Sequence, residues 1–464
     1  MADLASIVKA YDVRGTVPDQ LNPEVVRAIG AAFVQVLSAD GPVERIVIGY
    51  DMRPSSPELA AAFAAGATAL GADVVDAGLC STDELYFASG SLDIPGVMLT
   101  ASHNPAQYNG LKMCRKGAKP IGQDTGLRAI RDAAQAILDG ADVVPVARPG
   151  VVAKQDLLVQ YAGYLNALVD LTGIRPLKVV VDAGNGMAGH TIPAVFGLGA
   201  QGAANGSVLP LHVIPMYFEL DGTFPNHEAN PLEPANLVDL QKRVVAEGAD
   251  IGLAFDGDAD RCFVVDSDGA PVSPSAVTGL VAVRELAKNP GGTIIHNLIT
   301  SRAVPEIVAE NGGVAVRTRV GHSFIKEEMA KTGAVFGGEH SAHYYFKDFW
   351  GADTGLLAAM HVLAALGETD APLSEIGARY ERYAASGEIN STVADQAAKV
   401  AEIATAFPDA DTDDLDGLTV SLPDGAWFNV RASNTEPLLR LNVEAPTAER
   451  MAQVRDEALA IIRR

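Results

Sequence analysis

The sequence predicts an α/β protein with three similar mixed α/β domains and a smaller C-terminal α+β domain. Short runs of β-branched residues alternate with Ala- and Leu-rich stretches of helical length, a pattern typical of helices layered on sheets. With 464 residues, of which 48% are hydrophobic, the chain is too long for one core. We therefore expect three or four domains of ordinary size.

The first domain is expected at residues 1–150, with the Val-, Pro- and Gly-rich stretch 140–150 as a linker. Ser56 and Pro57 have the order of a helix N-cap followed by a first-turn proline. The predicted strands are 44–51, 72–79, 97–100 and 111–115, and the predicted helices are 56–70 and 125–139.

Three further domains are expected at 151–248, 249–367 and 368–464. The strand 177–182 ends in Gly184-Asn185-Gly186, whose spacing matches neither a dinucleotide fingerprint nor a P-loop, so a tight strand-to-helix turn is favoured. Other predicted helices are 155–171, 236–247, 353–366 and 447–463, and other predicted strands are 249–255, 293–296, 314–319, 418–422, 427–431 and 438–443.

Charge and cysteine content exclude several classes of protein. The net charge of −23 argues against binding to nucleic acid or to an anionic membrane surface. The three scattered cysteines form neither a disulfide framework nor a zinc spacing, which fits a reducing cytoplasm. The first nine residues lack the features of an export signal, and no apolar run reaches the roughly 18 residues of a membrane span.

The first motif with chemical character is Thr100-Ala101-Ser102-His103-Asn104-Pro105, a polar turn after the apolar run 97–99. Proline blocks continuation of the strand, so the Ser102 hydroxyl lies on a tight turn, where a nucleophile could be placed. A hydroxyl needs a base or a metal to become reactive. By itself, the Ser102-His103 pair is more typical of a surface turn.

Asp256, Asp258 and Asp260 alternate with small residues directly after a predicted strand. Three such carboxylates repel one another unless a cation lies between them, and their oxygens suit a hard divalent ion such as Mg²⁺. An EF-hand is excluded, because Arg261 and Ser267 stand where its glycine and glutamate belong. A solvated acidic turn is the remaining alternative, and Arg261, which could hold a phosphate beside a metal, argues against it.

Two later loops also combine small and polar residues. The loop 337–343 contains Glu339, Ser341 and His343, a set that suits sugar hydroxyls, although a hairpin turn would have a similar composition. The loop 431–437 combines arginine, two hydroxyls and an amide at the end of a strand, as a dianionic phosphate requires.

These four motifs together resemble those of the α-D-phosphohexomutase superfamily, and most closely its bacterial phosphomannomutase/phosphoglucomutase branch. The matching segments are TASHNP at 100–105, DGDADR at 256–261, GEHSAH at 338–343 and RASNTEP at 431–437, with further matches at 11–15, 109–112 and 320–322. The resemblance covers essentially the whole chain, in the family's order and spacing.

The resemblance implies four domains around a central cleft and interconversion of hexose 1-phosphate and hexose 6-phosphate, with mannose, glucose or both as the sugar. It implies a phosphoserine enzyme, Mg²⁺, and hexose 1,6-bisphosphate as intermediate and activator. It also implies small-molecule sugar phosphates as the partners of a monomer or homodimer. The implied roles are Ser102 as phosphoserine and metal ligand; Asp256, Asp258 and Asp260 as metal ligands; Glu339 and Ser341 on the sugar; Arg431, Ser433, Asn434 and Thr435 on the phosphate; and Tyr11, Arg14, His103, Lys112, Arg261, His322 and His343 along the cleft, with Lys112 and His322 as candidates for proton transfer.

Departures from the family pattern leave alternatives open. His340 stands where methionine is common, which weakens the expectation of mannose or glucose, so a phosphoglucosamine mutase is the alternative within the class. A metal-dependent sugar phosphatase and a non-catalytic sugar-phosphate sensor are alternatives from other classes, although a sensor would need neither Ser102 nor the three aspartates. Ser81-Thr82-Asp83 replaces the more usual Pro-Thr-Pro and is expected to affect packing or the edge of the cleft.

Overall fold

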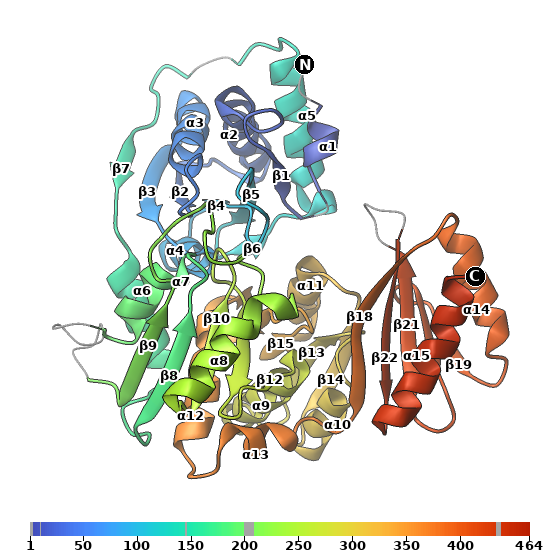
Figure 1. The fold of residues 1–464 in the computed structure, drawn as a ribbon. Helices are drawn as coiled ribbons and strands as arrows, with labels where there is room; N and C mark the ends of the chain where they lie inside the picture. The colour runs from blue at the N-terminus through green and yellow to red at the C-terminus, as the bar shows by residue number, and fades with distance from the viewer. Residues whose placement is uncertain (1–2, 10, 144–145, 199–207, 433–437) are drawn as a thin grey trace. The chain divides into compact units, whose positions relative to one another are not determined.

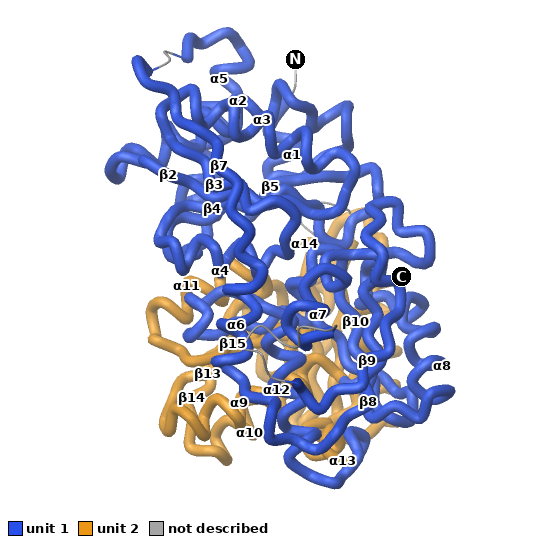
Figure 2. Tube along the Cα trace, turned by 90° about the vertical axis from the view of Figure 1, so that its left-hand side faces the viewer, with its two compact units in different colours: residues 1–272, 341–374 blue, residues 273–340, 375–464 orange. Residues whose placement is uncertain are grey.

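The computed structural model describes residues 3–9, 11–143, 146–198, 208–432 and 438–464. The chain forms two compact units, each made of two segments of the sequence (Figure 2). Unit 1 contains residues 1–272 and 341–374, and unit 2 contains residues 273–340 and 375–464.

A seven-stranded mixed sheet organises the N-terminal part of unit 1. Its strands are β1 (Val13–Thr16), β2 (Arg45–Tyr50), β3 (Asp73–Leu79), β4 (Gly96–Leu99), β5 (Tyr108–Arg115), β6 (Lys119–Pro120) and β7 (Val152–Lys154). The order is β1-β5-β4-β2-β3-β7, with β6 beside β5. Strands β4, β2, β3 and β7 are parallel, whereas β5 is antiparallel to both β4 and β1.

Helices cover both faces of this sheet. They are α1 (Leu4–Ile7), α2 (Pro23–Leu37), α3 (Ser56–Ala69), α4 (Thr82–Leu92) and α5 (Leu127–Leu138). Helices α2, α3 and α5 lie on one side and α4 on the other (Figure 1). Successive side chains of β2 point to opposite faces of the sheet, so each face needs its own cover. Ile46 and Ile48 are buried in the core with α2 and α3. On the other face, a side chain at Gly49 would meet Leu85 of α4.

Serine 56 differs from its predicted role. Helix α3 begins at Ser56, and its N-cap residue is Ser55, which makes no side-chain capping bond. The Ser56 hydroxyl instead donates to the buried Asp51 carboxylate at 2.6 Å. The predicted cap was therefore wrong, because a buried acceptor after β2 binds this hydroxyl.

The second sheet of unit 1 has five strands, in the order β12-β11-β10-β8-β9. They are β8 (Leu177–Asp182), β9 (Leu211–Met216), β10 (Ile251–Phe255), β11 (Cys262–Asp266) and β12 (Pro271–Val272), accompanied by α6 (Leu158–Leu168), α7 (Ala188–Val195), α8 (Val238–Glu247), the hairpin β16 (Tyr344–Phe346) and β17 (Ala352–Asp353), and α12 (Gly355–Gly367). The predicted third unit began with 249–255, but β10 pairs in parallel with β8 and is a central strand of the second sheet. The exact domain boundaries stay a prediction.

Unit 2 contains a parallel three-stranded arrangement and an antiparallel sheet. Its first part has the strand order β14-β13-β15, with β13 (Thr293–Asn297), β14 (Val314–Thr318), β15 (Phe336–Gly338), α9 (Pro274–Lys288), α10 (Ala303–Glu310) and α11 (His322–Thr332). Its second part has the order β18-β22-β21-β20-β19, with β18 (Ala384–Thr392), β19 (Asp411–Asp413), β20 (Leu418–Ser421), β21 (Trp427–Ala432), β22 (Leu438–Ala445), α14 (Gln396–Ala406) and α15 (Ala448–Ile462). Helix α13 (Leu373–Ala378) lies where the chain passes from unit 1 to unit 2.

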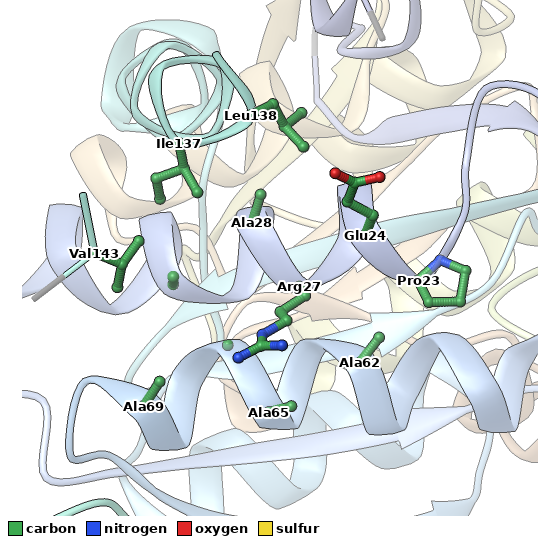
Figure 3. A pocket seen from close by; sticks show the side chains of 12 residues that line it. Pro23, Glu24, Arg27, Ala28, Ala62, Ala65, Ala69, Ile137, Leu138 and Val143 are labelled. Carbon is green, nitrogen blue, oxygen red and sulfur yellow. The ribbon is translucent and has the colours of Figure 1, made fainter. Parts of the chain in front are cut away.

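A cavity of about 580 Å³ opens over helices α2 and α3. Figure 3 shows Ala28 of α2 and Ala62, Ala65 and Ala69 of α3, with the Arg27 side chain between these two helices and with Ile137 and Leu138 of α5 as a further wall. None of the residues predicted to act on a ligand lines it. Among the described residues, no helix has the length and apolar character needed to cross a bilayer.

Candidate active site

Serine 102 lies on the turn that follows β4 and is 1% exposed. Its backbone has φ of +49°, in the left-handed region that few residues other than glycine adopt. The Ser102 N–H donates to Thr100 Oγ1 at 2.9 Å, and the Ser102 hydroxyl donates to Asp256 Oδ2 at 2.8 Å. Two motifs that are 154 residues apart in the sequence therefore meet at this hydroxyl.

The turn after β10 brings the three aspartates together. Asp256, Asp258 and Asp260 are all buried, and carboxylate oxygens of the three lie within 4.8 Å of one another. Gly257 permits this approach, because a Cβ atom there would lie 2.5 Å from the Ser102 carbonyl oxygen. The aspartate turn and the serine turn are thus packed backbone against backbone.

The donor set of this cluster fits a hard divalent cation. The Oδ1 atoms of Asp258 and Asp260 are buried and have no hydrogen-bond partner among the described residues. Burial and the neighbouring Asp258 raise the pKa of Asp256 to about 6. Burial and Asp258 also raise the pKa of Asp260 well above its ordinary value. Burial is the larger cause of both shifts. The mutual repulsion of the carboxylates adds to it, and a bound cation would relieve that repulsion.

Lysine 112 projects from β5 into the same cluster. Its Nζ lies 2.7 Å from Asp258 Oδ2 and 2.5 Å from Asp260 Oδ2. Burial alone would lower the pKa of Lys112, but the charges of Asp258 and Asp260 outweigh burial and raise it. The same contact, opposing the effect of burial, lowers the pKa of Asp258. Lys112 therefore carries its proton and has the character of a donor rather than a base.

Arginine 261 joins two histidines. Its NH2 group donates to His103 Nδ1 at 2.8 Å, and its Nε donates to His343 Nε2 at 3.2 Å. Burial and the charge of Arg261 lower the pKa of His103 well below its ordinary value, so this imidazole is neutral. Ser341 Oγ lies 3.0 Å from His343 Nδ1. The contact between Arg261 and His343 places the loop 341–343 beside the aspartate turn within unit 1.

The N-terminal segment contributes Arg14, whose NH1 donates to Asn104 Oδ1 at 2.5 Å and whose NH2 contacts Asp12 at 2.6 Å. Arg14 Nε is buried and has no hydrogen-bond partner in the described part of the chain. Arg14 is thus placed at the serine turn. Tyr11 is partly exposed at the start of the same segment.

The remaining predicted residues lie in unit 2. Glu339 follows β15 and is buried, and its Oε1 accepts from Asn297 Nδ2 and from the Gly321 N–H, both at 3.2 Å. His322 is the first residue of α11. His340 Nδ1 lies 3.4 Å from Ser275 Oγ, and burial lowers its pKa.

Arginine 431 lies on β21 and is 9% exposed. Its NH2 group contacts Glu388 Oε2 at 2.6 Å, and Arg440 contacts the other oxygen of Glu388 at 3.3 Å. The Nε of Arg431 is buried without a hydrogen-bond partner among the described residues. Ser433, Asn434 and Thr435, predicted to bind phosphate, lie outside those residues.

The segment 81–83, which departs from the family pattern, contacts the aspartate cluster. Thr82 Oγ1 donates to Asp258 Oδ2 at 2.5 Å, and the Thr82 N–H donates to the Asp258 carbonyl. Asp83 accepts from Tyr161 at 2.6 Å and from Thr354 at 2.7 Å, and burial raises its pKa to about 6. Asp83 thus has a packing role, as predicted, whereas the direct contact of Thr82 with Asp258 was not anticipated.

Comparison with known proteins defines the class. The chain matches all four domain families of phosphoglucomutase/phosphomannomutase: domain I at 5–139, domain II at 160–269, domain III at 274–383 and the C-terminal domain at 388–461. It belongs to the phosphoglucomutase/phosphomannomutase family, and the predicted fold class and family are confirmed.

Individual relatives agree with this assignment. The chain is 40% identical to "Phosphohexose mutases" of Xanthomonas campestris pv. campestris, over 97% of this chain and 98% of the relative. It is 41% identical to a phosphomannomutase of Salmonella montevideo over 94% of each chain. A phosphoglucomutase/phosphomannomutase family protein of Burkholderia thailandensis superposes with a TM-score of 0.88 at 33% identity, covering 99% of this chain and 97% of its own. The protein is a phosphohexomutase, an isomerase.

Proposed function

We propose that this enzyme interconverts the 1- and 6-phosphates of mannose and glucose through phosphorylated Ser102 and a hexose 1,6-bisphosphate. The observation that carries the proposal is the 2.8 Å hydrogen bond from the Ser102 hydroxyl to Asp256, at the edge of a buried three-aspartate cluster. The relatives named as phosphohexose mutases and phosphomannomutase support the choice of sugars over glucosamine.

In the proposed reaction, the bond between phosphorus and Ser102 Oγ breaks as a bond forms to the free hydroxyl of the sugar phosphate. The hydroxyl loses one proton and Ser102 Oγ gains one, so that the serine returns to its hydroxyl form. Asp256, Asp258 and Asp260 would hold Mg²⁺. The ion, when bound, supplies positive charge that stabilises the phosphoryl oxygens. Lys112 and Arg261 add fixed positive charges beside the aspartate cluster. The resulting bisphosphate must then reverse its orientation in the site, so that its other phosphate returns a phosphoryl group to Ser102.

Residues of unit 2 are proposed to bind the rest of the substrate. Glu339 is held by two donors and can accept further hydrogen bonds from sugar hydroxyls. Arg431 is proposed to bind the phosphate that is not reacting. Its guanidinium already has an anionic partner in Glu388, and its Nε has an unused donor among the described contacts. His322, with Lys112, remains the proposal for proton transfer.

Arg431→Ala is expected to raise KM for hexose 1-phosphate about 10- to 150-fold. A lost charge-assisted contact costs roughly 1.5 to 3 kcal/mol, which corresponds to that range of affinity. Steady-state kinetics measure the change. Arg317→Ala is a matched control, because Arg317 also pairs with an acidic residue of unit 2, Asp413, but is not assigned to substrate. An unaltered KM in Arg431→Ala would remove Arg431 from the phosphate site.

The same assays test the choice of sugar. Glucose and mannose phosphates differ only at C2, and none of the residues proposed here is assigned to that carbon. We therefore expect kcat/KM values for the two sugars within about two orders of magnitude. A larger preference for one epimer would show that a further group contacts C2. Release of inorganic phosphate at the mutase rate would instead indicate a phosphatase.

A further inference from the structure

Arginine 53 has no part in the reaction proposed above. It lies three residues after the end of β2 and is 1% exposed. Its guanidinium donates to four backbone carbonyls of the serine turn and of the segment that leads from it into β5. The acceptors are the carbonyl oxygens of Ser102 at 2.8 Å, Asn104 at 2.7 Å, Pro105 at 2.9 Å and Tyr108 at 3.0 Å. With the bond from Nε to Asp51 at 3.1 Å, all five N–H groups of the guanidinium are used.

These bonds hold a turn whose backbone is strained at Ser102. The left-handed region is unfavourable for serine, and such a conformation persists only where surrounding contacts enforce it. Within the turn itself, the Asn104 N–H donates to the Ala101 carbonyl and the Tyr108 N–H donates to the Pro105 carbonyl. Arg53 links these two short turns by binding carbonyls of both.

Neighbouring residues enclose the guanidinium and neutralise its charge. The buried Asp51 binds its Nε and also accepts from the Arg53 N–H and the Ser56 hydroxyl. The ring of Phe224 covers one face of the guanidinium, with its centroid 5.1 Å from Arg53 Cζ. A Cβ atom at Gly222 would lie 2.6 Å from Arg53 Cα, so this loop is packed directly on Arg53. Arg53 therefore has no donor left for a substrate.

We propose that Arg53 is a positioning residue for Ser102, which holds the serine turn in the strained conformation that directs Oγ at Asp256. The proposal rests on the proposed function of Ser102. The hydroxyl must accept and return a phosphoryl group in every cycle, and a displacement of about 1 Å at a reacting atom can lower the rate about 100-fold. Substrate binding involves other residues, so its affinity should be preserved.

Arg53→Lys tests this role, because lysine keeps the positive charge but has its three donors on a single nitrogen and cannot span four carbonyls. We expect kcat to fall about 100-fold while KM for hexose 1-phosphate changes less than about threefold. The rate at which hexose 1,6-bisphosphate phosphorylates Ser102, followed by intact mass spectrometry, should fall in parallel with kcat. A merely structural role would lower the melting temperature without this split between kcat and KM.

Arg175→Lys is the matched control. Arg175 also belongs to unit 1 and also donates to a backbone carbonyl, that of Thr369, and to a carboxylate, that of Asp250, but it is not in contact with the serine turn. This variant is expected to keep wild-type kcat and phosphorylation rate. A kcat in Arg53→Lys within about threefold of wild type, or equal losses in both variants, would overturn the proposal.

A second variant keeps the test decisive if Arg53→Lys does not fold. Phe224→Leu changes a partly exposed ring and removes the aromatic face over Arg53. In that case Phe224→Leu is expected to lower kcat about three- to tenfold with KM unchanged, and wild-type kcat would contradict the proposal. If the wild-type enzyme itself gained no phosphoryl group at Ser102, the proposed function would fail instead, and the two failures are therefore distinguishable.

Discussion

Replacing Ser102 with alanine is expected to reduce mutase turnover to background while the protein stays folded. The Ser102 hydroxyl donates to Asp256, whereas the Thr82 hydroxyl is already engaged with Asp258 and is not part of the serine turn. Loss of one hydrogen bond to a carboxylate should cost roughly 1.5 to 3 kcal/mol in stability at most. Turnover is measured with hexose 1-phosphate, and folding by thermal denaturation.

Two further variants separate chemistry from backbone strain. Ser102→Gly removes the same hydroxyl but relieves the positive φ, so it should be as inactive as Ser102→Ala and somewhat more stable. Ser91→Ala removes a hydroxyl that donates to the Ala88 carbonyl within α4, and it should retain activity. Residual turnover of Ser102→Ala within about tenfold of wild type would refute the assignment of Ser102 as the phosphoryl carrier.

The second large effect is expected for Asp258→Asn, which should weaken Mg²⁺ binding and lower turnover far more than it lowers stability. Lys112 also contacts Asp260, at 2.5 Å in the wild type, so we expect the buried ammonium to keep an acidic partner in this variant. Removing one charge also relieves the repulsion that adds to burial in raising the pKa values of Asp256 and Asp260. Calorimetric titration with Mg²⁺ and the dependence of rate on Mg²⁺ concentration measure the effect.

Asp266→Asn provides the matched control for this variant. Asp266 is also buried in unit 1, but its carboxylate accepts from the Asp268 and Ala270 N–H groups of a turn and lies outside the aspartate cluster. Asp266→Asn should therefore show the same dependence of rate on Mg²⁺ concentration as the wild type. If Asp258→Asn also showed an unchanged Mg²⁺ dependence, the aspartate turn would not be the metal site.

Local sequence patterns predicted much of the fold, because strands and helices with clear periodicity carry their signal in neighbouring residues. The strand predicted at 44–51 is β2, and the strand predicted at 177–182 is β8. Helix α2 was missed although Asn22 and Pro23 are ordinary start signals, and the Asn22 side chain does cap it. The place of β10 in the second sheet could not be predicted, since strand order depends on long-range pairing.

In the candidate site as well, local motifs could be predicted from the sequence, whereas long-range contacts could not. Ser102 and the three aspartates were recognised as separate motifs, whereas the hydrogen bond between Ser102 and Asp256 depends on how two distant turns pack. Arg53 follows Asp51 by two residues, a spacing too common to indicate a buried network by itself. Glu388 lies in an irregular part of β18, where the register with β22 shifts, and no sequence signal pointed to its contact with Arg431.

The measurement that tests the central proposal most directly is intact mass spectrometry of the enzyme after incubation with hexose 1,6-bisphosphate, followed by addition of hexose 6-phosphate. We expect one phosphoryl group to appear on the wild-type chain, to map to Ser102, and to transfer to the added sugar phosphate as bisphosphate is formed. Ser102→Ala should gain none. A phosphoryl group on another residue, or its loss to water rather than to the sugar, would contradict a phosphoserine mutase.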